Sequence, residues 1–309
     1  MKTNKLLQSF IILGTLSLFF PSCTNKHAIV DSKPKLVYKV DKTSKKGIFS
    51  LKQGKNIAIS QLVHESEKYP VIFVGDHHNE EKTHQFFNQY LQGLAKKGYK
   101  IHLANEWFSP EHNALLKRYT DGKINAEGLK KGRGWDKFTS LRWDLVGNLY
   151  ETVKKSGGKL YGINLSKKDR KKISKRLFEQ MSKEEKRFYD SLDLNVKAHR
   201  ALVMPFFSHC KQRPQKGNEP CNERMYKVQV AWDTYMGEES AKIAKNIIKT
   251  KKDKLIVFAG AMHVAYGLGI PLRFARKSNL PSYIISNHKN GSETLDANIA
   301  DAVFIYTGK

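Results

Sequence analysis

The stretch YPVIFVGDHHNEEKTHQFFNQYLQGL (residues 69–94) decides the fold class. It opens with the apolar run 71–74, which is typical of a strand buried on both faces. After Glu80 the apolar residues recur with helical spacing, at Phe87, Tyr90, Leu91 and Leu94. A buried strand that leads directly into an amphipathic helix is the repeating unit of a parallel α/β sheet.

The same alternation continues along the chain. Apolar runs typical of strands cover residues 70–75, 100–108, 159–165, 254–263, 282–286 and 301–306. We therefore expect an α/β fold, with a mostly parallel sheet and flanking helices, built from residues 55–165 and 226–309. No such run occurs in residues 166–225, which predict a smaller all-helical domain, either alone or together with residues 109–156. Ahead of the main fold, KLVYKV and KGIFS predict a short hairpin within residues 23–54.

The N-terminus has the composition of an export signal. Two lysines precede an apolar stretch of about 15 residues, which is too short to span a membrane comfortably. Cys23 then follows a small residue, as at a bacterial lipobox, although Phe20 and Pro21 depart from the usual pattern. We expect residues 1–22 to be a cleaved signal peptide and Cys23 to carry a lipid that anchors the protein in the bacterial cell envelope, at the outer membrane. An ordinary cleaved signal with a stray cysteine is the alternative.

Two further cysteines, Cys210 and Cys221, bracket the polar loop KQRPQKGNEP. In an oxidising compartment, an even pair of cysteines around such a loop favours a disulfide. Two free thiols or a two-cysteine metal site are the alternatives.

The chain is strongly basic. Its formal charge is +26, and removing residues 1–22 lowers it to +24, because two lysines and no acid are lost. The lysines are spread over loops and expected helix ends rather than gathered in one patch. For an exported protein, an anionic lipid surface or an acidic ligand is therefore a better partner than nucleic acid.

Polar residues with ligating chemistry follow three of the predicted strands. Asp76 and His78 follow the first run, Glu106 lies near the end of the second, and His263 ends the fourth. Because the carboxyl ends of parallel strands share one edge, where ligands bind, we expect these side chains to meet there. His84 lies three residues before Phe87 and should face the sheet as well. The alternative for each is a hydrogen-bonded structural residue.

Five segments resemble, in order over roughly residues 70–275, the ChaN-type haem-binding lipoproteins: VGDHHNEEKTHQ, ANEWF, RWDLVGNLYETVKKSGGKLYGIN, YKVQVAWDTYM and VFAGAMHVAYGLGIP. The resemblance implies a parallel sheet with flanking helices and a small helical domain. It also implies binding of ferric haem b at a homodimer interface, two haems per dimer placed face to face. The implied role is haem-iron uptake with an outer-membrane haem receptor as partner.

The resemblance also assigns residues. The family's G-E-x-H pattern falls on residues 75–78, with Asp76 in place of Glu, and its N-x-P-R segment falls on residues 164–167, with Lys167 in place of Arg. In that family a histidine and a basic residue hold the haem propionates. The residues implied to contact haem are therefore Asp76, His78, His84, Glu106, Lys167 and His263.

The implied iron ligand is a tyrosine, and the chain has 13. We place Tyr150 first, because its predicted helix also carries Trp143 and Leu149 on an aromatic and aliphatic face. Tyr226 and Tyr119 are the alternatives. A phenolate is a hard anionic donor that suits ferric iron. For each, the competing interpretation is a core tyrosine.

We expect a binding protein rather than an enzyme. The chain contains no G-x-S-x-G, H-E-x-x-H or phosphate-binding glycine motif. The alternative function is a hydrolase, metal-dependent or metal-free, that uses His78, Glu106 and His263. This set resembles, more distantly, the erythromycin-esterase and Tiki-type proteins, and Glu106 or a histidine would activate water.

Overall fold

The computed structural model describes residues 37–39, 47–138, 141–175, 177–212, 220–289 and 294–307. The expected signal peptide, Cys23 and the tether after it lie outside these residues. Within them, the main sheet is eight-stranded. Its order is β3 (Lys55–Ile57), β2 (Gly47–Ser50), β10 (Ala302–Tyr306), β8 (Ser282–Lys289), β4 (Val71–Asp76), β7 (Asp253–Gly260), β5 (Lys100–Asn105) and β6 (Leu160–Gly162).

From β10 to β6, all neighbouring strands are parallel, and β2 and β3 extend the sheet antiparallel beyond β10. The central strand β4 is buried along its whole length, as its continuous apolar run predicts. The expected mostly parallel α/β sheet is confirmed.

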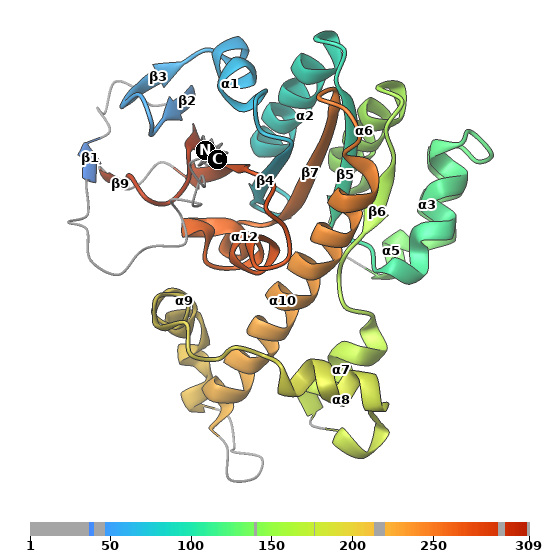
Figure 1. Cartoon of the computed structure of the whole chain (residues 1–309), viewed down its shortest axis with the longest axis vertical. Helices are drawn as coiled ribbons and strands as arrows, with labels where there is room; N and C mark the ends of the chain where they lie inside the picture. Colours follow the sequence, from blue (N-terminus) through green and yellow to red (C-terminus); the bar gives the residue numbers. More distant parts are fainter. Residues whose placement is uncertain are drawn as a thin grey trace, which may run out of the picture.

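Helices cover both faces of the sheet (Figure 1). Side chains alternate along a strand, so Ile72 and Val74 of β4 join one core while Val71 and Phe73 join the other. The first core includes residues of α1 (Ile59–Ser66), α2 (Glu81–Lys96) and α6 (Trp143–Lys155). The second includes residues of α10 (Cys221–Ile247), α11 (Ala261–Val264) and α12 (Ile270–Ala275). Between β5 and α6 the chain forms η2 (Pro110–His112), α3 (Asn113–Thr120), α4 (Ala126–Arg133) and α5 (Trp135–Phe138), and η5 (Ala265–Gly267) follows α11.

The remaining helices gather at one end of the molecule around the first half of α10, with α7 and α8 to one side and α9 to the other (Figure 1). They are α7 (Lys167–Lys175), η3 (Phe178–Gln180), α8 (Lys183–Asp190), α9 (Lys197–Val203) and η4 (Met204–Gln212). Cys210 and Cys221 form the expected disulfide here, with Cα atoms 5.4 Å apart. Because α10 is 27 residues long, it connects this helical end to the sheet.

The expected N-terminal hairpin is wrong. The strand β1 (Val37–Lys39) pairs antiparallel with β9 (Thr294–Asp296), whereas β2 pairs with β3 and β10. Pairing with β10 buries Ile48 and Phe49 of β2 against the main sheet, which a free hairpin with β1 would not do. In the described part of the chain, no helix is long and apolar enough to cross a membrane.

Candidate functional site

The strands β4, β7 and β5 are neighbours, so their carboxyl ends meet at one point of the sheet edge. Asp76 ends β4, Glu106 follows β5, and His263 lies in α11 directly after β7. The order of the strands therefore brings together the residues that the sequence predicts to meet.

Two imidazoles face the carboxylate of Glu106. His78 Nε2 lies 3.3 Å from Glu106 Oε1, and His263 Nε2 lies 3.8 Å from Glu106 Oε2. The other ring nitrogen of His78 hydrogen-bonds to Asp76 at 2.7 Å. Asp76 also lies 3.0 Å from Nε2 of His84, which α2 carries in its first turn.

A second aspartate, which the sequence analysis missed, mirrors Asp76. Asp233 of α10 approaches His263 Nδ1 to 2.5 Å and His199 Nε2 to 2.9 Å. Gln229 Nε2, one helical turn earlier, lies 3.0 Å from His263 Nδ1. Imidazoles and carboxylates thus alternate in one chain of contacts. We call this set the edge relay: His84, Asp76, His78, Glu106, His263, Asp233 and His199.

Two glycines allow the backbone to pack closely around the relay. A Cβ at Gly75 would lie 2.9 Å from Val264 Cγ2 and 3.0 Å from Ala261 Cα, so α11 sits directly on β4. A Cβ at Gly237 would lie 2.6 Å from Cβ of Arg273, where α10 crosses α12. Gly237 is one turn beyond Asp233, so this crossing holds Asp233 against the sheet edge.

Four groups of the relay, Asp76, His78, Asp233 and His263, favour their charged forms. Burial by itself would raise the pKa of Asp76 and of Asp233, but the neighbouring histidines lower both. Burial by itself would lower the pKa of His78 and of His263, but the carboxylates raise both. Opposite charges at hydrogen-bonding distance therefore outweigh desolvation at each of these groups.

The contacts within the relay join imidazoles to carboxylates. Over the described ranges, no group of three or more His, Cys, Asp or Glu side chains could hold a metal ion. Both ring nitrogens of His78 and of His263 face carboxylate oxygens, and Nε2 of each ring faces the carboxylate of Glu106.

A small cavity of about 190 Å³ adjoins Glu106. Trp107 and Phe108 line it together with three cations, Arg133, Lys167 and Arg170. Lys167 therefore lies beside the relay, at the position where the resemblance implies a cation. Two buried polar atoms of its lining residues have no hydrogen-bond partner: Trp107 Nε1 and Asn164 Oδ1.

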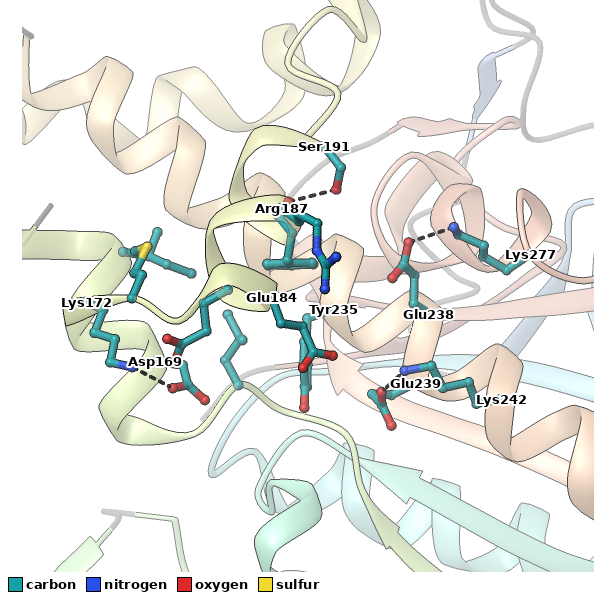
Figure 2. Close-up of a pocket in the computed structure, with 15 residues that line it drawn as sticks. Asp169, Lys172, Glu184, Arg187, Ser191, Tyr235, Glu238, Glu239, Lys242 and Lys277 are labelled. Carbon is teal, nitrogen blue, oxygen red and sulfur yellow. Dashed lines mark hydrogen bonds and ion pairs between the residues drawn. The ribbon is translucent and has the colours of Figure 1, made fainter. Parts of the chain in front are cut away.

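A larger cavity of about 500 Å³ lies on the other side of α7, between α7, α8 and α10 (Figure 2). Its apolar lining consists of Leu165, Ile173, Met181, Phe188 and the ring of Tyr235. Ion pairs of Lys242 with Glu239, at 2.6 Å, and of Lys277 with Glu238, at 3.2 Å, stand along it. Leu165 lines both cavities, so α7 and the residues just before it form the wall between them.

None of the three tyrosines expected as iron ligands reaches either cavity. Tyr150, Tyr226 and Tyr119 are at most 1 % exposed. The hydroxyl of Tyr150 points to Asn105 at 3.4 Å, and that of Tyr119 donates to Glu151 at 2.6 Å. The aromatic face that suggested Tyr150 is the face that packs on the sheet, beside Phe108 and Trp143. This conformation therefore does not support any of the three as a ligand.

Tyr235 is the tyrosine that lines the larger cavity, and the sequence analysis missed it. Its side chain is only partly buried. Burial and nearby carboxylates, Glu239 first among them, raise its pKa to about 12. Its phenol is therefore protonated when the cavity is empty at neutral pH.

This chain is similar to several known proteins. Residues 62–274 match the family described as "Haem-binding uptake, Tiki superfamily, ChaN". Among solved structures, ChaN of Campylobacter jejuni with cofacially bound haem is 20 % identical, with a TM-score of 0.65 over 84 % of this chain and 96 % of that one. The type III effector HopBA1 is 15 % identical, with a TM-score of 0.47 over 81 % of this chain and 94 % of that one. The search of curated proteins finds no match.

At these identities, the likeness to solved structures shows the fold alone. The family match is stronger evidence, because it spans more than half of the chain and includes β4, α6, α10 and the residues of the edge relay. This protein belongs to the ChaN family of haem-binding uptake proteins within the Tiki superfamily.

Proposed function

We propose that this protein binds haem and serves haem uptake without catalysing a reaction on it. The family description supports haem as the ligand. The observation that carries the proposal within this chain is the larger cavity, because its size and lining suit the chemistry of haem. Haem offers broad apolar faces, two carboxylate arms and an iron that takes an axial ligand.

The larger cavity suits the apolar part of haem. Its volume of about 500 Å³ lies within the range of pockets that hold drug-sized ligands, roughly 300–1,000 Å³. The apolar side chains of Leu165, Ile173, Met181 and Phe188 can pack against a porphyrin face. The smaller cavity, at about 190 Å³, falls below that range, although its cations could receive a single carboxylate arm.

Four cations and five carboxylates line the larger cavity, so a propionate needs a cation there that is not already paired. Figure 2 shows the side chain of Arg187 pointing into the cavity. Its guanidinium has no ion-pair partner in the part of the chain that the structure describes, whereas Lys242 and Lys277 are paired with glutamates. An arginine can bind a carboxylate through two parallel hydrogen bonds, so we assign Arg187 as the first propionate contact.

We assign Tyr235 as the axial ligand of ferric iron, in place of Tyr150, Tyr226 and Tyr119. Tyr235 is the tyrosine whose ring lines a cavity of haem size. A phenolate oxygen would supply ferric iron with an anionic axial donor. Because the pKa of Tyr235 is about 12 in the empty site, haem binding should release its proton.

The finer parts of the proposal follow from the resemblance. ChaN of Campylobacter jejuni binds haem cofacially. By analogy, a homodimer of this chain would cover the open side of the cavity and place two ferric haems face to face. Lipidation at Cys23 would hold the protein in the cell envelope, at the outer membrane. An outer-membrane haem receptor would then be the natural partner.

A hemin titration of the protein lacking residues 1–23, followed by absorbance, tests the proposal. We expect a saturable Soret band and, by sedimentation, a shift from monomer to dimer as hemin is added. Hemin that binds without saturation, as it does to an unrelated basic protein, would contradict haem uptake as the function. Saturable binding with no change in mass would support haem as the ligand and contradict the proposed dimer.

A further inference from the structure

Going beyond haem binding, we propose that the smaller cavity is a binding site for a phosphate dianion. The proposal rests on three cations that line a cavity of about 190 Å³, together with hydrogen-bonding groups that suit a singly protonated oxyanion. It is independent of the larger cavity, of Tyr235 and of any reaction at the edge relay.

Two of the three cations stand at the start of α7. Lys167 and Arg170 are one helical turn apart, so they share a face of the helix, and both line the smaller cavity. Within the described ranges neither forms a salt bridge, and the guanidinium of Arg170 lies over the ring of Trp232, 5.7 Å from its centroid. The amino-terminal end of the α7 dipole adds partial positive charge at the same place. An anion in the cavity would therefore gain two cations that are not already paired.

The third cation, Arg133, is held in the cavity wall. Its Nε and Nη2 donate to the carbonyl oxygen of Trp107 at 3.3 and 3.2 Å, and its guanidinium lies 5.5 Å from the ring centroid of Phe108. These contacts restrict the guanidinium before a ligand arrives, so less conformational entropy is lost on binding. Burial lowers the pKa of Arg133, because its charge has lost part of its hydration, and an anionic partner would offset that loss.

The carboxylates of the cavity do not cancel these cations. Glu106 faces the imidazoles of His78 and His263, at 3.3 and 3.8 Å, so its charge is met mainly within the edge relay. The other carboxylate, Glu111, accepts a hydrogen bond from the hydroxyl of Ser109 at 2.9 Å. Three cations thus stand against one remaining carboxylate, and this excess favours a doubly charged anion over a singly charged one.

Hydrogen-bonding groups in the wall select a protonated oxyanion. Trp107 Nε1 and Asn164 Oδ1 are buried polar atoms with no partner among the described residues. The orientation of Asn164 is set by its Nδ2, which donates to the carbonyl oxygen of Glu106 at 2.8 Å. Together with the carboxylate of Glu111, the wall therefore offers acceptors as well as donors. Hydrogen phosphate has acceptor oxygens and one hydroxyl donor, whereas sulfate, with the same shape and charge, has no proton to donate.

The size of the cavity favours the free ion. Its volume of about 190 Å³ is below the roughly 300–1,000 Å³ of pockets that hold drug-sized ligands. Free phosphate and the phosphate group of a sugar monoester offer the same charge and oxygens. Only the free ion fits such a volume without leaving part of the ligand outside, so we expect free phosphate to bind more tightly.

Isothermal titration calorimetry of the protein lacking residues 1–23, without hemin, tests the proposal. Inorganic phosphate is the probe, and sulfate, bicarbonate and glucose 1-phosphate are compared with it slightly above neutral pH and at constant ionic strength. We expect saturable binding of phosphate with a Kd at least about tenfold below that of each other ion, since sulfate loses a hydrogen bond and bicarbonate loses a charge. Sulfate or bicarbonate that binds as tightly would overturn the ligand class. A monoester that binds more tightly would overturn the free ion as the ligand.

Three variants on α7 separate a defined site from attraction to a basic chain. Arg170→Ala and Lys167→Ala should each raise the Kd for phosphate about tenfold or more, because each removes a charge-assisted contact. Lys168→Ala is the matched control, since it removes the same charge from an exposed neighbour that does not line the cavity. Its Kd should stay within about twofold of the unaltered protein. An equal loss in Lys168→Ala, or heat that does not saturate, would overturn the site. Because hemin is absent, neither result depends on the haem proposal.

Discussion

Asp233 Oδ1 and His263 Nδ1 lie 2.5 Å apart, although 30 residues separate them in the sequence. Asp233 belongs to the helix that connects the helical end to the sheet, and His263 follows a central strand. Because Asp233 also binds His199 of α9 at 2.9 Å, this one carboxylate joins three parts of the fold. The site at the sheet edge and the packing of the helical end are therefore coupled.

Asp233→Asn should lower the free energy of unfolding by about 3 kcal/mol, since it leaves two buried histidines without their carboxylate. The loss should depend on pH. The pKa of Asp233 lies below its ordinary value of 3.8, so its stabilisation is complete above that pH and is lost as pH falls. The pKa of His263 lies above its ordinary value of 6.5, so its stabilisation is complete below that pH and is lost as pH rises.

Urea unfolding of the two proteins at pH 3, 5.5 and 9 checks this. The difference between them should be largest near pH 5.5 and smaller at both extremes. A difference that does not change with pH would show that Asp233 acts through packing or hydrogen bonding alone.

Gly75→Ala should destabilise the protein by about 1–3 kcal/mol, the usual cost of overpacking a core. The new methyl group would meet Val264 and the backbone of Ala261, and it would push α11, with His263, away from the sheet. Gly260→Ala is the matched control, because its methyl group would have nothing nearer than 3.5 Å. Thermal unfolding of both variants should separate them, and equal melting temperatures would contradict the close contact between β4 and α11.

Removing the disulfide by Cys210→Ser and Cys221→Ser should lower the free energy of unfolding by about 2–3 kcal/mol, as expected for closure of a short loop. The two cysteines pack with Val203, Phe207 and Val230 at the helical end. Hydrogen exchange should therefore speed up mainly in α9 and the start of α10. Faster exchange in β4 and β7 as well would show that the helical end and the sheet unfold together.

Periodicity predicted the sheet well, because each central strand is buried on both faces and carries its own continuous apolar signal. The sequence predicted that His78, Glu106 and His263 meet, because the carboxyl ends of parallel strands share one edge of the sheet. Asp233 and His199 have no such local signal, since their role depends on where α9 and α10 dock. Only Gln229 and Asp233 together, four residues apart on an otherwise apolar helix face, hinted at a buried polar site.

The tyrosines show what a sequence pattern leaves undecided. An aromatic and aliphatic helix face is typical of packing on a sheet as much as of a haem contact, and at Tyr150 packing is what the structure shows. Tyr235 shares the helix of Asp233 but points to a different side, into a cavity that α7 and α8 complete. A cavity formed by separate helices cannot be read from one segment of sequence.

The most direct test of the haem proposal is the absorption and electron paramagnetic resonance spectrum of the hemin complex, compared with that of Tyr235→Phe. Tyr150→Phe is the matched control, because it removes the same hydroxyl from a buried site. We predict a high-spin ferric, tyrosine-ligated spectrum that is kept in Tyr150→Phe and lost in Tyr235→Phe. An unchanged spectrum in Tyr235→Phe would contradict the assignment of the larger cavity as the haem site.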